Sequence, residues 1–302
     1  MNVIELEKIT KTYGTHKAVD DLTLMVPKGS IYGFIGPNGS GKTTTIRMIM
    51  NILYPDNGNI KLFGKELIGS RMEQIGYLPE ERGLYTKMKV KDLIKFHGEL
   101  KGVKNLDATA DEWLAKFDLT KWADKKVEAL SKGMSQKVQF IITVIDLPDI
   151  IILDEPFSGL DPVNAEIIKE EILKLRDKGS TIIFSTHDMS VAEKMCDYIF
   201  MIYKGKKVLD GTLTSIQEKF GTDTIRVQTE MGAAALTDLR GVEKVNDLGA
   251  IQELKMEKHA DSQEVLQAIM GKTKVLRFEL ASPSLNDIFI RIARPDNTED
   301  HE

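Results

Sequence analysis

Apolar and polar residues alternate near the start of the chain, a pattern that predicts half-buried β-strands. The alternation runs over residues 3–6 and returns over residues 22–26, with polar turn residues such as Pro27, Lys28 and Gly29 between the pieces. We therefore expect a small antiparallel β-subdomain at the N-terminus.

Farther along, short apolar runs alternate with stretches of helical periodicity. The predicted elements are, in order, a strand over 31–35, a helix over 42–52, helical structure over 90–118 and 135–146, a strand over 150–153, a helix over 162–178 and a strand over 181–185. Strands that alternate with helices predict an α/β fold with a largely parallel sheet. Residues 90–146 form a helical insert within it.

The pattern changes near Gly221, where we place a domain boundary at about residue 220. The predicted elements are then a strand over 225–229, a short helix over 233–239, strands over 242–248 and 251–257, a helix over 263–270, a strand over 275–280 and a last amphipathic helix over 284–293. The first six follow a β-α-β-β-α-β order, which predicts a small α+β domain of ferredoxin-like plan over residues 221–295. Residues 296–302 are expected to form a disordered acidic tail.

Composition narrows the class of protein. The chain has 302 residues and a formal net charge of -5, so it offers no strongly basic domain and we expect no nucleic-acid partner. Cys196 is the only cysteine, which excludes an intrachain disulfide and suits a reducing compartment. No signal-peptide pattern is present, and no apolar run approaches the ~18–20 residues of a membrane-spanning helix. A role at a membrane would therefore require a partner chain.

A glycine-rich loop follows the strand over residues 31–35 and matches the pattern G-x-x-x-x-G-K-[ST] in full. Backbone N–H groups in such a loop surround phosphate oxygens, and the following helix adds the positive end of its dipole. Lys42 is expected to reach the β- and γ-phosphates, and the Thr43 hydroxyl to ligate Mg²⁺. The predicted phosphate-binding residues are Gly36, Pro37, Asn38, Gly39, Ser40, Gly41, Lys42, Thr43 and Thr44.

Two carboxylates, Asp154 and Glu155, end the apolar strand over residues 150–153. Ligands in parallel sheets bind at the carboxyl ends of the strands, so both side chains are expected at the phosphate site. Asp154 fits a role in organising Mg²⁺, and Glu155 fits a general base that activates or orients the attacking water.

With these motifs the chain resembles the ABC ATPase family, the nucleotide-binding subunits of ABC transporters. Residues 130–134 (Leu-Ser-Lys-Gly-Met) resemble the LSGGQ signature, and the resemblance implies that Ser131 and Gly133 bind the γ-phosphate of ATP held by another subunit. Residues 158–161 match the D-loop that ends in Asp161. His187 matches the switch histidine that contacts the γ-phosphate, and Tyr13 the aromatic residue that stacks on adenine. Glu155, His187 and Lys42 are the expected catalytic residues.

The sequence departs from the family pattern at two places. Lys132 and Met134 replace the second glycine and the glutamine of the signature. Glu80 stands where the family's Q-loop glutamine contacts Mg²⁺ and water, so the expected metal-binding residues are Thr43, Asp154 and Glu80. Residues 78–85 and the C-terminal plan are similar to the ABC-2 exporter branch and its sodium-extrusion (NatA-like) ATPases.

The resemblance implies an ATP- and Mg²⁺-dependent ATPase that drives a separate membrane permease from the cytoplasmic face of the membrane. Because the chain has one phosphate loop and one signature, a complete site requires a second ATPase subunit, expected as a homodimer that closes on ATP. A soluble ABC ATPase of translation or DNA repair is the alternative, although a basic linker and a long coiled coil are both absent from the sequence. A regulatory binding module with little turnover is a third hypothesis.

Overall fold

The computed structural model describes residues 1–67, 72–80, 83–221, 224–257 and 260–293. The chain divides into two compact units, Met1–Thr212 and Leu213–Glu302. This division lies eight residues before the expected boundary at residue 220, because the helix α7 (Leu213–Phe220) belongs to the second unit. There Gln217 Nε2 donates a hydrogen bond to Pro283 O at 3.0 Å. The acidic tail predicted over residues 296–302 lies outside the described residues.

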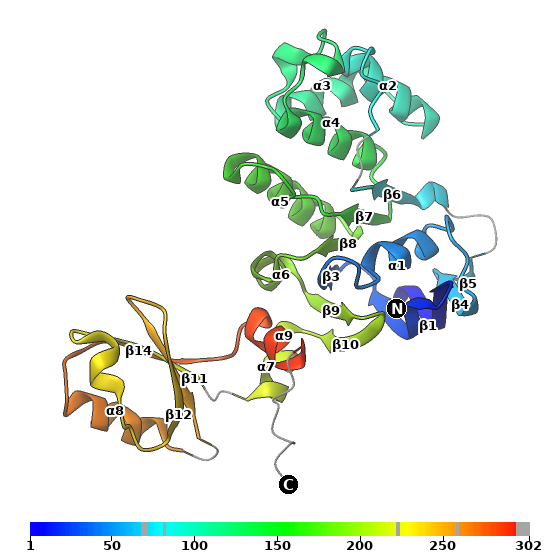
Figure 1. Cartoon of the computed structure of the whole chain (residues 1–302). Helices are drawn as coiled ribbons and strands as arrows, with labels where there is room; N and C mark the ends of the chain where they lie inside the picture. Colours follow the sequence, from blue (N-terminus) through cyan, green and yellow to red (C-terminus); the bar gives the residue numbers. More distant parts are fainter. Residues whose placement is uncertain (68–71, 81–82, 222–223, 258–259, 294–302) are drawn as a thin grey trace. The chain divides into compact units, whose positions relative to one another are not determined.

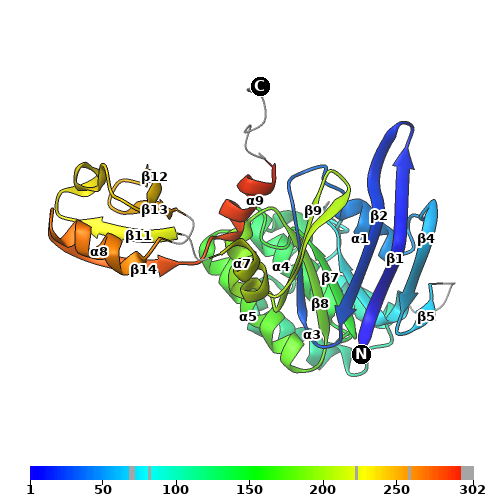
Figure 2. The same ribbon diagram turned by 90° about the horizontal axis from the view of Figure 1, so that it is seen from below.

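The first unit begins with an antiparallel sheet, as the alternating pattern predicted. Its strand order is β2-β1-β4-β5, and long, twisted β1 and β2 stand side by side in Figure 2. The strands are β1 (Asn2–Tyr13), β2 (His16–Pro27), β4 (Asn57–Leu62) and β5 (Lys65–Glu66).

A second, six-stranded sheet forms the centre of this unit, with strand order β10-β9-β3-β8-β7-β6 (Figure 1). All neighbouring strands pair in parallel except the β9–β10 hairpin. The strands are β3 (Ile31–Ile35), β6 (Ile75–Leu78), β7 (Ile150–Asp154), β8 (Thr181–Thr186), β9 (Tyr198–Tyr203) and β10 (Lys206–Gly211). The accompanying helices are α1 (Lys42–Ile49), α5 (Pro162–Asp177) and α6 (Met189–Met195). The predicted α/β fold is therefore confirmed.

Strand β7 shows how the central sheet separates two cores. Ile150 and Ile152 belong to the core shared with the antiparallel sheet and α1, whereas Ile151 and Leu153 belong to the core shared with α4 and α5. Successive side chains of a strand point to opposite faces, so a strand buried on both sides is apolar at every position. The same alternation directs the next residue, Asp154, to the α1 side, where the phosphate loop begins that helix.

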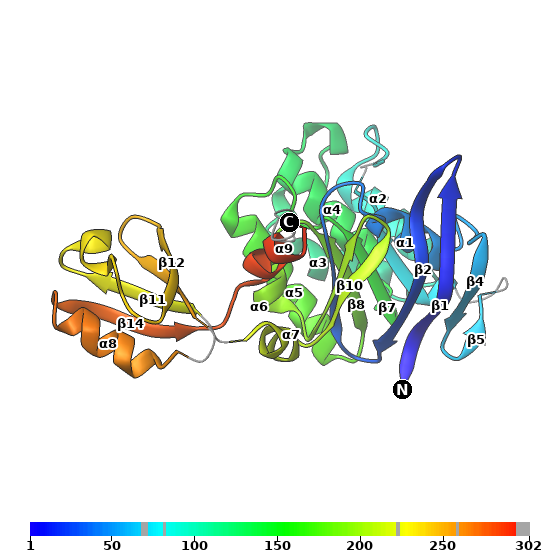
Figure 3. The ribbon, with the colours of Figure 1, turned by 60° about the horizontal axis from the view of Figure 1, so that its bottom comes forward.

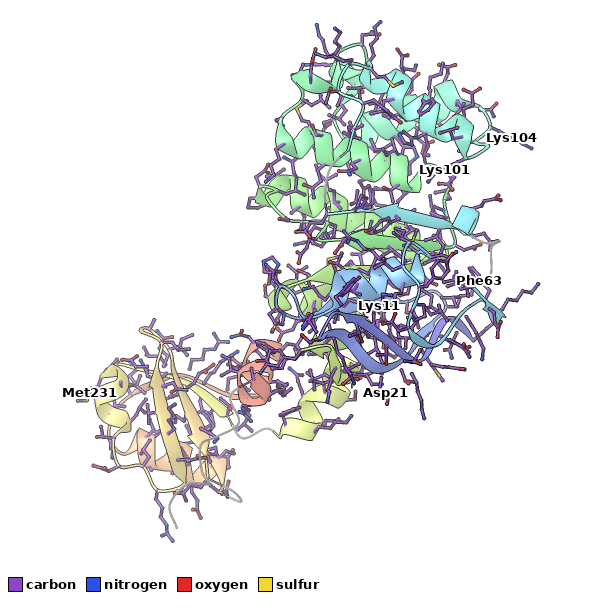
Figure 4. All side chains as sticks on the ribbon, turned by 45° about the vertical axis from the view of Figure 1, so that its right-hand side comes forward. Lys11, Asp21, Phe63, Lys101, Lys104 and Met231 are labelled. Carbon is purple, nitrogen blue, oxygen red and sulfur yellow. The ribbon has the colours of Figure 1, made fainter. Side chains whose placement is uncertain are left out.

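The insert consists of the helices α2 (Val90–Leu100), α3 (Leu106–Lys116) and α4 (Lys132–Val144). Figure 1 shows the three grouped beyond the β6 edge of the sheet, and Figure 4 marks Lys101 and Lys104 in the α2–α3 connection. Helix α4 begins three residues before the predicted start at residue 135, because Ser131 caps it: Ser131 Oγ accepts from the Met134 N–H at 3.2 Å. Short 3₁₀ turns lie at Met72–Gln74, Thr120–Trp122 and Val127–Ala129.

The second unit contains a four-stranded antiparallel sheet with strand order β12-β13-β11-β14 (Figure 3). This order, with the elements between the strands, matches the predicted ferredoxin-like plan, except that a 3₁₀ turn over Gly232–Leu236 replaces the first helix. The elements are β11 (Thr224–Thr229), β12 (Val242–Asp247), β13 (Gln252–Met256), α8 (Ser262–Met270), β14 (Val275–Ala281) and α9 (Leu285–Ala293).

Candidate active site

The phosphate loop connects β3 to α1, and its backbone conformation requires glycine. Gly36, Gly39 and Gly41 have φ angles of 153°, 74° and 113°, which residues with a side chain rarely adopt. A Cβ atom would also lie 2.3 Å from Ile202 O at Gly36 and 2.4 Å from Ala18 O at Gly41. The loop therefore takes its shape because these residues have no side chain, and its backbone stays open to a ligand.

Lys42 is only 6% exposed, and its ammonium group lies inside the loop. Nζ donates to Gly36 O at 2.7 Å and to Pro37 O at 3.1 Å. Burial lowers the pKa of Lys42, and the negative charges of Glu155, Asp154 and Glu80 oppose that shift. The lysine is thus a desolvated cation held by weak neutral acceptors, an arrangement that favours an incoming anion.

Asp154 ends β7 and is buried on the α1 side. Ser185 Oγ, from the neighbouring strand β8, donates to Asp154 Oδ1. Among the residues that the structure describes, Asp154 Oδ2 and Ser40 Oγ are buried without a hydrogen-bond partner. Buried oxygens without a donor are costly in a folded protein, and hard cations such as Mg²⁺ prefer oxygen ligands. The oxygens present here fit such a cation.

Glu155 lies at the point where the chain leaves β7, with a left-handed φ of 50°. Its N–H donates to Ser185 O, and its Oε1 accepts from the His187 N–H at 3.1 Å. The ring Nδ1 of His187 lies 2.8 Å from the same Oε1. This left-handed φ is uncommon for a non-glycine residue and turns the chain sharply at the end of the strand. The strand and the histidine together hold the Glu155 carboxylate in place.

A hollow of about 380 Å³ brings most of the predicted site residues together. It is lined by Tyr13, Asn38, Gly39, Gly41, Lys42, Thr43, Thr44, Glu80, Asp154 and Glu155, and by the unpredicted His16 and Ala18. Tyr13 is 48% exposed and faces His16 across the β1–β2 turn. The hollow therefore combines the aromatic ring of Tyr13, residues of the phosphate loop and the carboxylates of Glu80, Asp154 and Glu155.

Ser131, Gly133 and Asp161 do not line this hollow but form a second group. Ser131 and Asp161 are the N-caps of α4 and α5. Asn164 N–H donates to Asp161 Oδ1 at 3.0 Å, and this bond lowers the Asp161 pKa. A Cβ atom at Gly133 would lie 3.3 Å from Asn164 Nδ2, so the signature and the D-loop meet at this asparagine.

A smaller hollow of about 340 Å³ extends from the carboxylates toward α4 and is lined by Glu80, Glu155, Ser158, Lys132 and Gln136, among others. The Lys132 side chain reaches across the D-loop, so that a Cβ atom at Gly159 would lie 2.5 Å from its Nζ.

Sequence reasoning missed Gln136, whose side-chain amide donates to Pro156 O. It also missed Ser185, which ends the next predicted strand along the chain, because only the structure shows that Asp154 and Ser185 are register partners.

Two family models match the chain. One, described as ABC transporter, covers residues 19–158, and the other, an ATP-binding protein DrrA1-3-like C-terminal domain, covers residues 211–293. The ABC transporter ATP-binding protein YhaQ of Bacillus subtilis, itself named as uncharacterized, is 41% identical over 95% of this chain and 97% of that relative. The chain belongs to the ABC transporter ATP-binding proteins. It is an ATP-binding and ATP-hydrolysing transporter subunit.

Other relatives indicate which ABC transporter ATP-binding proteins this chain resembles. The ABC transporter ATP-binding protein NatA of Bacillus subtilis is 36% identical over 67% of this chain and 85% of that relative, which confirms the predicted NatA-like resemblance. The Nod factor export ATP-binding protein I of Burkholderia lata is 30% identical over 96% of each chain. The solved structure of an ATP-binding subunit of an ABC transporter superposes with a TM-score of 0.68 at 29% identity, over 72% of this chain and 93% of that one. These relatives do not support the alternative of a translation or DNA-repair ATPase.

Proposed function

We propose that the chain is the motor of an exporter: it hydrolyses ATP with Mg²⁺ at the hollow described above and closes with a second copy on two ATP molecules. The observation that carries this proposal is the separation of the site into two groups. The loop, Asp154 and Glu155 line the hollow, whereas Ser131 and Gly133 lie outside it. The anion-binding groups of the signature are therefore left for the nucleotide of another subunit.

The phosphates bind along the loop amides and α1, with Lys42 moving from its carbonyl partners to the β- and γ-phosphates. Tyr13 stacks on the adenine at the rim. Thr43, Asp154 and Glu80 would hold Mg²⁺, which would supply positive charge to neutralise the phosphate oxygens. Ser185 supports Asp154 through the hydrogen bond to Oδ1.

Hydrolysis needs a water aimed at the γ-phosphate. Glu155 accepts a proton from this water or orients it, and His187 positions the Glu155 carboxylate through its N–H and Nδ1. Lys42 stabilises the negative charge that spreads over the transferred phosphoryl oxygens. Ser131, Gly133 and Asp161 of the second copy complete the site at the γ-phosphate. Ser131 and Gly133 do so at the N-terminus of α4, where they bind the phosphate.

The transported cargo passes through a permease on another chain, and the subunit works at the cytoplasmic face of the membrane. No helix in the described ranges is both long and apolar enough to cross a bilayer. The permease would dock near residues 80–88 and the insert, where Tyr85 and Phe96 are exposed and their rings meet edge to face at 6.0 Å. The relative named for Nod factor export supports the direction of transport.

Two experiments test this proposal. Glu155→Gln should bind ATP without hydrolysing it and should form a dimer on a sizing column when ATP and Mg²⁺ are present. A Glu155→Gln chain that gains no dimer at saturating ATP would refute the closure. Isolation of the intact chain from membranes should also recover an integral membrane subunit; recovery of ribosomes or DNA instead would refute the transport role.

A further inference from the structure

Strand β14 is an edge of the C-terminal sheet. The strand order β12-β13-β11-β14 gives it one partner, β11, and within the described residues no strand pairs with its other side. Figure 2 shows β14 as the outermost strand on this side of the sheet. An edge strand presents unpaired N–H and C=O groups, which are a template for pairing with another strand.

The two edges of this sheet differ in character. The opposite edge, β12, exposes Glu243, Lys244, Asn246 and Asp247, and charged or polar side chains of this kind discourage pairing. Strand β14 instead exposes two leucines, Leu276 at 53% and Leu280 at 54%. Strand β14 also exposes Arg277, but unlike β12 it presents large apolar side chains beside its charges, so it is the edge better suited to a partner.

The sequence of β14 complements itself when it is reversed. Its residues are Val-Leu-Arg-Phe-Glu-Leu-Ala, with Phe278 at the centre. In an antiparallel pair of two such strands centred on Phe278, Arg277 faces Glu279 of the second copy. Leu276, at the register shift between β11 and β14, then lies beside Leu280 of the second copy. Opposite charges and apolar pairs that face each other across strands are the stabilising units of a sheet. Any other register of the two strands would lose these matches.

Neighbouring strand β11 already fixes the faces of this edge. Its Val227 pairs with Phe278, and its Ile225 with Leu280, so Phe278 and Leu280 lie on the helix-covered face of the sheet. Arg277 and Glu279 lie on the other face, where the Arg277 guanidinium now bonds the Glu279 carboxylate of its own strand at 2.5 Å. Both side chains are about half exposed and can exchange this contact for one across strands.

We propose that two copies of this chain pair through β14, antiparallel and centred on Phe278. Two sheets of four strands then join into one of eight. The contact lies in the C-terminal unit, requires no nucleotide and goes beyond the proposed ATP-driven closure. It would keep two ATPase subunits together while their nucleotide sites open, because a tethered second contact raises the effective concentration of the first.

Charge reversal on the full-length chain tests the register. Without nucleotide, the wild-type chain should show a concentration-dependent dimer by sedimentation velocity. Residue 277 of each copy faces residue 279 of the other, so the pair has two such contacts. Arg277→Glu makes both contacts repulsive, and so does Glu279→Arg, so each variant alone should be monomeric. An equal mixture of the two variants should dimerise again, and so should the double variant Arg277→Glu/Glu279→Arg. A wild-type monomer at every concentration, dimers of the single variants, or a mixture that stays monomeric would each overturn the proposal.

Cross-linking tests the centre of the pair. In a Cys196→Ser background, Phe278→Cys places the two thiols on the twofold axis, where facing Cα atoms lie about 4.5–5.5 Å apart, within disulfide range. Leu276→Cys is the matched control, because its twin lies four positions away along the strands, roughly 14 Å. Oxidation without nucleotide should form an intermolecular disulfide in the Phe278→Cys variant and none in the Leu276→Cys variant. Equal linking of both, or none in a variant whose circular dichroism and melting match the wild type, would overturn the register. Because ATP is absent, failure here leaves the ATP-dependent closure of Glu155→Gln unaffected.

Discussion

His187 holds Glu155 by two contacts to one oxygen: its backbone N–H lies 3.1 Å and its ring Nδ1 2.8 Å from Glu155 Oε1. The His187 side chain is otherwise 59% exposed, whereas that of Glu155 is 11% exposed. The carboxylate is thus fixed by a residue that follows the neighbouring strand β8. A proton on Nδ1 makes the ring a donor to Glu155. This relationship makes His187 a positioning residue for the proposed base.

Removing that ring should impair chemistry more than binding. We expect His187→Ala to lower kcat by about 10²-fold, the order of one lost electrostatic donor, with little change in KM for ATP. His187→Gln, whose amide can also donate, should recover part of the rate. Steady-state kinetics of the three chains measure this; a KM increase at unchanged kcat would mean that His187 serves nucleotide binding instead.

The lowered pKa of Lys42 predicts a proton linkage. The charged lysine binds phosphate, and a bound anion favours the charged form, so nucleotide binding should raise the Lys42 pKa and take up a proton at pH values near the lowered pKa. ATP affinity should fall as pH rises through the lowered pKa, earlier than for an ordinary lysine near ~10.4. Calorimetry in buffers of different ionisation enthalpy counts the protons. The exposed Lys65→Ala should behave as wild type, whereas uptake that persists in Lys42→Ala would assign the proton elsewhere.

Ser185 should stabilise the fold most when no Mg²⁺ is bound at Asp154. Ser185→Ala removes the donor to Asp154 Oδ1, in a carboxylate whose Oδ2 has no protein donor among the described residues. We expect a loss of about 1–3 kcal/mol in unfolding free energy without Mg²⁺, and a smaller loss with Mg²⁺ and ATP. Denaturant melts in both conditions measure it. An equal loss in both would show that Ser185 supports the fold and not the metal.

The fold was predictable because its signals are local. The strand β7 is apolar at every position, which indicates burial on both faces, and the loop from Gly36 to Thr43 has fixed spacing between a strand and a helix. The start of α4 was placed three residues late because capping by Ser131 depends on a side-chain hydrogen bond that periodicity does not record.

The contacts between distant segments were less predictable. The ring of His187 lies on Glu155, and Ser185 supports Asp154, because β7 and β8 pair in one register, which the sequence does not state. Gln136 reaches Pro156 because α4 lies beside the strand end. The position of Lys132 over Gly159 likewise follows from how α4 meets the D-loop.

Tyr13 should contribute to adenine binding and to nothing else at the site. It lies on the rim of the hollow, about half exposed. Tyr13→Ala should weaken ATP binding by about 1–3 kcal/mol, the usual value of stacking a base on an aromatic ring, whereas Tyr13→Trp should retain it. Inorganic tripolyphosphate, which has no base, is the control ligand. If its affinity falls equally in Tyr13→Ala, the residue acts on the loop and not on the base.

Glu80 lines both hollows, and its negative charge acts on Lys42. Its carboxylate should repel the γ-phosphate directly and attract Mg²⁺. We therefore expect Glu80→Gln to bind ATP more tightly in EDTA and to need more Mg²⁺ for half-maximal hydrolysis. Glu66→Gln, on exposed β5, is the charge-matched control. Nucleotide titrations in EDTA and Mg²⁺ titrations of the rate measure the two effects separately. If neither moves, Glu80 faces solvent when ATP is bound; if the Mg²⁺ requirement falls, the glutamine is the better ligand and the carboxylate restrains turnover.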